Sequence, residues 1–229
     1  EDVNDSYHAF KEGHRTYARE MIRSLTQTCV ACHSRNASGV QYTAPEVMDL
    51  QDFKPIELGN FYSATRQFDR SIKEYRKIIK VPNFGSANPW DWEEALKQAM
   101  TLSVRVKRDP QLSESILQDA LAVKDLPYYI KQYISDWQNQ VKDWKAHPKN
   151  QVAEKDLFNS AKDFITKAKK NQRYLADHSS DILYLRASSA LFDLLQKYPQ
   201  SKYIGEALFM QGVCQENIGP RTFENLPRV

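Results

Sequence analysis

Prolines divide the chain after residue 55 into segments of helical length. A proline ring fixes φ and has no N–H to donate, so it interrupts or starts an α-helix. Between the breaks the apolar residues recur at spacings of three and four, and no segment shows the strict alternation typical of a strand. The pattern predicts an all-α fold of short helices joined by short loops, stacked as antiparallel hairpins. The breaks fall at Pro82, Pro89, Pro110, Pro127, Pro148 and Pro199. The expected helices cover roughly residues 56–68, 69–81, 90–107, 111–123, 127–145, 152–172, 180–198 and 202–217.

Composition limits the possible partners. No stretch approaches the roughly 18 apolar residues that a membrane helix requires, so we expect no membrane span. The formal net charge of +3 is small and evenly spread, which argues against a nucleic-acid partner. The chain opens with Glu1-Asp2-Val3 and no apolar segment, as expected of an exported protein whose signal peptide has been removed. We therefore expect a periplasmic or extracellular protein.

The first 55 residues differ from the rest. Spacings of three and four predict one amphipathic helix from residue 7 to residue 25 that leads directly into the pentapeptide CVACH. Residues 34–55 contain turn formers and two prolines, so we expect a loop with room for one short helix. The apolar residues of the expected helix are Tyr7, Phe10, Tyr17, Met21, Ile22 and Leu25.

CVACH supplies Cys29, Cys32 and His33, and this spacing favours covalent attachment of one c-type haem. On one helical turn, two thiols reach the two vinyl groups while the imidazole lies beneath the iron. Zinc needs four ligands, and the only other cysteine is Cys214, with no second pair to complete a tetrahedron. A thioredoxin-like redox pair follows a strand, and no βαβ pattern is present. We found no Ser-His-Asp set, phosphate loop or paired catalytic carboxylates, so an enzyme is not expected.

This segment resembles the opening of class I cytochromes c. An amphipathic helix enters the motif, and Pro45 follows His33 by twelve residues. The resemblance implies that His33 is the proximal iron ligand and that a carbonyl at Ala44 or Pro45 accepts its imidazole N–H. The resemblance does not extend beyond this segment, because the family's later distal methionine would fall near residue 95, in an expected helix.

The sixth iron ligand has several candidates. Met48, in the loop after the motif, can fold back over the iron; its competing role is packing between the loop and the first repeat. His14 is the alternative, but a straight helix would hold it about 22 Å from Cys29, so it requires a helix break. Met100 lies at the family-like distance in a context that favours core packing. An open sixth position is the remaining possibility.

Two stretches of the remaining chain resemble tetratricopeptide repeats, which stack helical hairpins into a solenoid. One has Leu58-Gly59, Tyr62, Phe68, Ser71, Tyr75, Ile78 and Pro82. The other has Tyr184, Ala187, Leu191, Leu194 and Pro199, followed by SKYIGEALFMQGVCQENIG, and is similar to repeats of periplasmic envelope-assembly proteins. The resemblance implies a haem-binding region at 1–55 and a repeat domain at 56–229.

Together these features predict a monohaem c-type cytochrome that transfers electrons. Its repeats would dock it to a redox protein partner within a larger, multi-subunit assembly. The alternative is a repeat scaffold, assembly factor or sensor in which the haem is structural or binds a gas.

Overall fold

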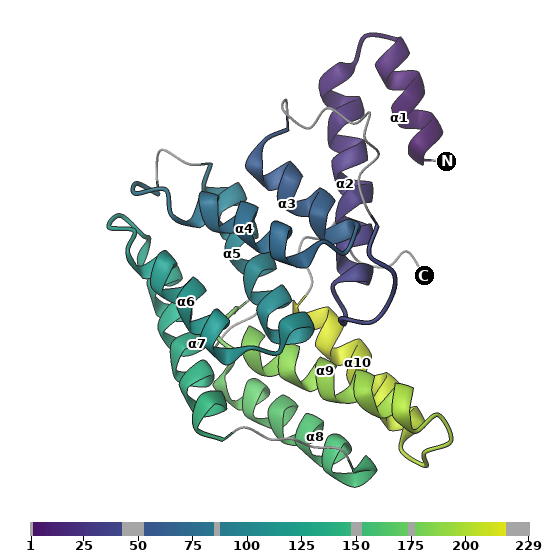
Figure 1. Ribbon diagram of the computed structural model, residues 1–229, viewed down its shortest axis with the longest axis vertical. Helices are drawn as coiled ribbons and strands as arrows, with labels where there is room; N and C mark the ends of the chain where they lie inside the picture. The colour runs from purple at the N-terminus through teal and green to yellow at the C-terminus, as the bar shows by residue number, and fades with distance from the viewer. Residues whose placement is uncertain (1, 43–52, 85–87, 148–152, 174–176, 219–229) are drawn as a thin grey trace.

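The computed structural model describes residues 2–42, 53–84, 88–147, 153–173 and 177–218. These residues form ten α-helices and one π-helix, with no strand among them, which confirms the predicted all-α class. Successive helices pack as hairpins (Figure 1). The elements are α1 (Asp2–Lys11), α2 (Arg15–His33), α3 (Pro55–Ala64), α4 (Phe68–Ile79), α5 (Pro89–Thr101), η1 (Leu102–Lys107), α6 (Pro110–Leu121), α7 (Tyr128–Ala146), α8 (Glu154–Asn171), α9 (Asp181–Lys197) and α10 (Ile204–Ile218).

Prolines mark helix starts because their missing N–H costs nothing in the first helical turn. Pro89 and Pro110 are the first residues of α5 and α6. Each is preceded by a capping side chain: Asn88 accepts from the Trp90 N–H, and Asp109 accepts from two backbone N–H groups. Two of the six breaks predicted from proline positions, those at Pro89 and Pro110, therefore coincide with helix N-termini that a side chain caps.

The expected single helix over residues 7–25 is wrong. The chain reverses at Gly13, whose φ of +89° is accessible to glycine but costly for other residues. The two helices α1 and α2 form a hairpin, in which the Ser6 hydroxyl donates to the Ala18 carbonyl over 2.9 Å. The spacing of apolar residues does not reveal a chain reversal when apolar residues with the same spacing lie on both sides of the turn. The expected apolar face is also largely exposed, with Tyr17 62% and Phe10 56% accessible.

A close helix contact fixes the hairpin of α3 and α4. The Tyr75 ring packs directly on Gly59, where a Cβ atom would lie 2.3 Å from Cε1 of the ring. The Ser71 hydroxyl donates to the Gly59 carbonyl over 2.8 Å, and the Tyr75 hydroxyl donates to Asn60 over 2.7 Å. The small residues in the first repeat-like stretch therefore allow the two backbones to approach.

The helix expected over residues 90–107 is an α-helix at its start and a π-helix at its C-terminal end. After α5 the chain continues as the π-helix η1, in which five consecutive residues from Leu102 to Val106 are buried. It packs against α5, α6 and α9. It ends at Arg108, which has a left-handed φ of 53° and forms a bidentate pair with Asp193.

Two hydrophobic clusters form the core. The first joins α3 to α7 and includes Ile182 and Leu185, while the second joins α8, α9 and α10. The central helix α9 thus contributes to both clusters. Neither cluster contains a residue that precedes Ile56, so α1 and α2 lie outside the main core. None of the described helices has the length and apolar character required to cross a membrane.

We expect Gly59→Ala to destabilise the protein by about 2 kcal/mol, because the new methyl group overlaps the Tyr75 ring. Urea denaturation measures the effect. Gly212→Ala is the matched control: it lies within α10 with no atom within 4 Å of the added Cβ, and alanine favours a helix by up to about 1 kcal/mol. Equal stability of Gly59→Ala and wild type would contradict the proposed close contact.

Candidate functional site

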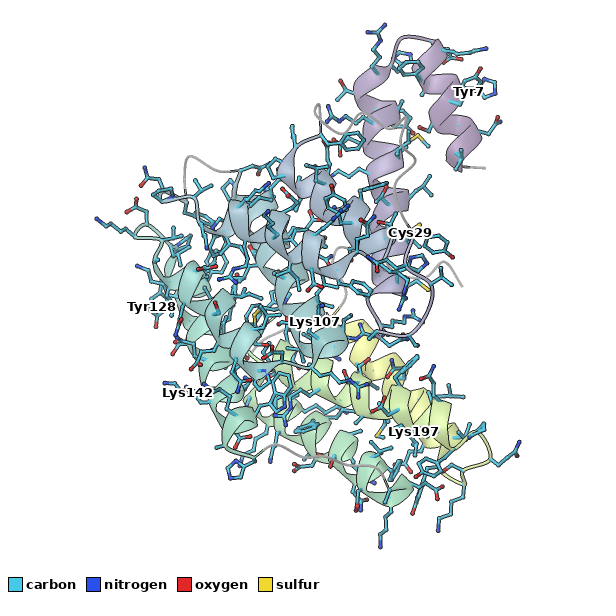
Figure 2. All side chains as sticks on the ribbon, in the orientation of Figure 1. Tyr7, Cys29, Lys107, Tyr128, Lys142 and Lys197 are labelled. Carbon is cyan, nitrogen blue, oxygen red and sulfur yellow. The ribbon has the colours of Figure 1, made fainter. Side chains whose placement is uncertain are left out.

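The CVACH pentapeptide forms the last turn and a half of α2. Cys29, Cys32 and His33 occupy positions i, i+3 and i+4, which place their side chains on neighbouring parts of one helix surface. Both cysteines are free thiols and exposed, while His33 is half-buried. Figure 2 shows Cys29 near the lower end of α2. The three predicted residues are therefore brought together, with both thiols accessible to a reaction partner.

The imidazole of His33 is held by the end of another helix. Its Nδ1 forms a hydrogen bond with the carbonyl of Ala64, the last residue of α3. A carbonyl only accepts, so this bond requires a proton on Nδ1; in the neutral imidazole, the lone pair of Nε2 is then free. The last carbonyls of a helix lack partners within it, and His33 satisfies one of them. This bond thus fixes both the tautomer and the orientation of the ring.

Arg66 lies in the turn after α3, and its side chain donates hydrogen bonds to the end of α2. Its guanidinium donates to the carbonyl of His33 over 3.1 Å, to that of Asn36 over 3.0 Å, and to that of Ser38. Its backbone has a left-handed φ of 63°, which reverses the chain between α3 and α4. A cation at a helix C-terminus also interacts favourably with the helix dipole.

The rest of the loop after the motif is tied to the same turn. The Tyr42 N–H donates to the Thr65 carbonyl, and the Gln67 amide donates to the Tyr42 carbonyl, each over 2.9 Å. Gly39 has a φ of +115° and lies against the Arg66 guanidinium, where a Cβ atom would be 3.1 Å from Cζ. Residues 34–42 are therefore fixed on the turn between α3 and α4.

Ion pairs join the upper part of α2 to the helices beneath it. Arg19 forms a bidentate pair with Glu57 of α3, with its shortest contact at 2.7 Å. Arg23 contacts Asp91 of α5 at 2.8 Å and Glu94 at 3.4 Å. Partial burial alone would raise the pKa of Glu57, but the backbone N–H before α3 and the Arg19 guanidinium hold that pKa below its ordinary value.

Glu94 connects three helices. Its Oε1 accepts from Gln27 of α2 and from Asn60 of α3, each over 3.2 Å. Asn60 is buried and in turn accepts from Tyr75 of α4. Val30 of α2, three residues after Gln27, is fully buried. The motif-bearing helix is consequently attached by a polar network with a small apolar contact.

The structure corrects two expectations about the iron ligands. Because α2 is unbroken from Arg15 to His33, His14 lies about 28 Å along the axis from His33 and does not reach an iron bound there. The carbonyl on His33 Nδ1 belongs to Ala64, whereas the family resemblance placed it at Ala44 or Pro45, which lie outside the described residues. Met48 also lies outside them.

Sequence reasoning missed Ala64 and Arg66. A backbone carbonyl leaves no residue-type signal, since any residue at position 64 supplies one. Arg66 lies in a turn between two predicted helices, where an arginine is ordinarily a solvated side chain. Met100, by contrast, is buried in the first core cluster, as its helical context predicted. Cys214 is also buried, as expected of a thiol on an apolar helix face.

A charged cleft of about 440 Å³ opens beside the loop. Ala37 and Gly39 of the loop line it together with Lys107 of η1, which pairs with Asp69 over 2.6 Å. Figure 2 labels Lys107 below the centre of the molecule. The guanidinium of Arg66 and that of Arg70 also line the cleft, so its charge is predominantly positive.

Comparisons of the chain with protein-family models, with curated proteins and with solved structures find no match. Two free thiols and an imidazole with an available Nε2, all on one helical turn, suit a covalently bound haem. Among the described residues, no three or more His, Cys, Asp or Glu side chains are arranged to hold a metal ion.

We expect Arg66→Lys to accelerate amide hydrogen exchange in residues 34–42 by roughly tenfold, equivalent to about 1.4 kcal/mol of local stability. An ammonium group does not span three carbonyls, while lysine leaves the left-handed backbone strain unchanged. The matched control is Arg70→Lys, because Arg70 lines the same cleft and donates to Gln67 rather than to the loop. Equal exchange in the two variants would show that Arg66 does not hold the loop.

Proposed function

We propose that this protein is a monohaem c-type cytochrome that transfers single electrons. The observation that carries the proposal is the arrangement at the end of α2: two exposed thiols beside an imidazole whose Nδ1 is held by the Ala64 carbonyl. This arrangement leaves Nε2 available to iron. In metal-bound histidines, a hydrogen bond from the ring nitrogen that does not bind the metal ordinarily fixes the ring orientation and increases the basicity of the ligand.

Covalent attachment uses the two cysteines. Each thiol adds across one vinyl group: the sulfur bonds to one vinyl carbon and the thiol hydrogen is transferred to the other, so no oxidant is consumed. The exposure of Cys29 and Cys32 leaves room for this reaction on the folded helix. When bound, the haem supplies an Fe(III)/Fe(II) couple that takes up and releases one electron.

His33 is the proposed proximal ligand, and Met48 is the proposed ligand on the opposite side. A histidine–methionine pair is the axial set of many electron-transferring cytochromes c. The position of Met48 in the chain, fifteen residues after His33, leaves a connection long enough to return to the iron. The fixed anchor of that connection at Tyr42 supports the assignment.

The helical body is the proposed docking surface for a redox protein partner in a periplasmic or cell-surface assembly. The contact of Gly59 with Tyr75 supports a tetratricopeptide-like hairpin at α3 and α4. The small and apolar positions of the second stretch are buried in α9, including Ala187 and Leu191. Solenoids of such hairpins present extended surfaces to other proteins. Exposed aromatic side chains on α1 and on the first turn of α2 offer additional contact area at the end of α2 remote from the motif.

The first test of this function is haem retention. Wild-type protein produced in an exporting host should keep its haem on a denaturing gel, because thioether bonds survive unfolding. Cys29→Ala combined with Cys32→Ala should abolish the haem stain. Cys214→Ala is the control, since this buried thiol lies in the second core cluster and should leave retention unchanged. A wild-type protein that contains zinc and no haem would overturn the proposal.

The second test concerns the axial ligand opposite His33. Met48→Ala should remove the sulfur-to-iron charge-transfer band of the oxidised protein and lower the reduction potential, because a thioether stabilises Fe(II). Met21→Ala is the matched control, a half-buried methionine on α2. An unchanged spectrum in Met48→Ala would exclude this ligand. Rapid binding of carbon monoxide to reduced wild type would indicate an open site and favour gas sensing over electron transfer.

A further inference from the structure

Three separate segments of the chain line the charged cleft beside the loop. They are the loop after the CVACH turn, through Ala37, Gly39 and Gln41, the start of α4, and the end of η1. The cleft volume of about 440 Å³ lies within the range of about 300 to 1,000 Å³ that is typical of small-molecule sites. The cleft is therefore large enough for a molecule with more than one charged group.

Cationic side chains outnumber carboxylates in this lining. Arg66, Arg70 and Lys107 are cations, and Asp69 is the one carboxylate among the described residues that line the cleft, which leaves a net charge of +2. Lys107 pairs with Asp69 over 2.6 Å. Arg66 donates to backbone carbonyls, which are neutral, and neither arginine forms an ion pair with a described carboxylate. Two guanidinium charges are thus without a counter-charge in the part of the chain that the structure describes.

Arg70 has donors available for a ligand. Its Nη1 donates to the Gln67 amide oxygen over 2.9 Å, and its guanidinium lies 5.8 Å from the centre of the Tyr62 ring. These contacts hold the side chain in place, while Nε and Nη2 form no hydrogen bond with any described residue. The N–H groups of these two atoms lie along one edge of the guanidinium. Such an edge matches two oxygens of a carboxylate or a phosphate.

Lys107 is also available to a ligand, because its ion pair with Asp69 is weakly held. The Asp69 side chain is 85% exposed, and exposed ion pairs contribute little to stability. An anionic group in the cleft can therefore replace the Asp69 carboxylate at Lys107. The start of α4 adds partial positive charge, since its first residues line the cleft and Gln67 before them provides no side-chain cap.

We propose that this cleft binds a small molecule that carries at least two carboxylate or phosphate groups. One group pairs with the free edge of Arg70 and another with Lys107, so the ligand offsets the net positive charge of the lining. The bound molecule joins the loop after the CVACH turn to α4 and η1. The proposal concerns the polypeptide alone and does not depend on the haem.

Calorimetric titration of the full-length protein with citrate and with pyrophosphate tests the proposal, with sodium chloride at equal ionic strength as the reference. One equivalent of at least one of these anions should bind, and the preferred anion identifies the ligand as a carboxylate or a phosphate. Arg70→Gln combined with Lys107→Gln should weaken that binding by roughly tenfold or more, because charge-assisted hydrogen bonds are lost.

The matched control removes the same charge from two exposed lysines of α7, Lys131→Gln combined with Lys142→Gln, and should leave the affinity unchanged. Lys142 is labelled in Figure 2. Equal weakening in the two double variants would show a general effect of net charge and overturn the site.

Two further measurements locate the ligand. Saturation with the preferred anion should slow amide hydrogen exchange in residues 37–41 and leave α7 unchanged, because the ligand holds the loop to its neighbours. Asp69→Asn should strengthen binding by roughly threefold, since it removes the carboxylate that competes for Lys107. Protection confined to other parts of the chain, or weaker binding by Asp69→Asn, would contradict the proposal.

The alternative occupant is a carboxylate of the chain itself. Glu46, Asp49 and Asp52 follow Gln41 in the sequence and lie outside the described residues. The triple variant Glu46→Gln/Asp49→Asn/Asp52→Asn separates the two possibilities. If wild type binds neither anion while the triple variant binds one, the chain's own carboxylates fill the cleft and the proposal fails. It fails equally if neither protein binds an anion, whereas binding by wild type that requires Arg70 and Lys107 supports it.

Discussion

The C-terminal ends of α2 and α3 meet at the CVACH turn, and each supplies a hydrogen-bond donor to a backbone carbonyl of the other. The end of α3 offers its Ala64 carbonyl to the His33 ring, and the residue that terminates that hairpin turn, Arg66, donates to three carbonyls at and beyond the end of α2. Helix C-termini carry partial negative charge, so their approach would be unfavourable without these donors. The orientation of the imidazole is thus a by-product of capping two helices at one place.

Two kinds of interaction stabilise the rest of the molecule, and they act in different parts of the chain. From Ile56 onward, the helices are held by two apolar clusters that share α9. Before Ile56, the attachment is mostly polar: arginines of α2 pair with acidic residues of α3 and α5, and Glu94 collects amide donors from two helices. This division leaves Cys29 and Cys32 exposed on α2, while ion pairs and hydrogen bonds hold the helix to α3 and α5.

The sequence predicted the helices well because prolines and apolar spacing are local signals. Pro89 and Pro110 begin helices where the missing N–H is harmless, and Gly59 and Tyr75 of the first repeat-like stretch lie in direct contact. The reversal at Gly13 was missed, because its signal is one backbone dihedral rather than a residue pattern. The Ala64 carbonyl was missed for a different reason: a contact between residues 31 positions apart depends on how the two helices pack.

The polar attachment of α2 also determines how this helix responds to the solution. The arginine pairs that join it to α3 and α5 are partly accessible, with the side chain of Arg19 55% exposed and that of Arg23 27% exposed. Mobile ions screen such pairs over a distance of about 8 Å at physiological ionic strength, whereas apolar clusters are insensitive to this screening. Rising salt therefore weakens the arginine pairs that attach α2 more than it weakens the packing within the two apolar clusters. The attachment of the helix that carries the two cysteines is accordingly more sensitive to ionic strength than the apolar core of the helical body.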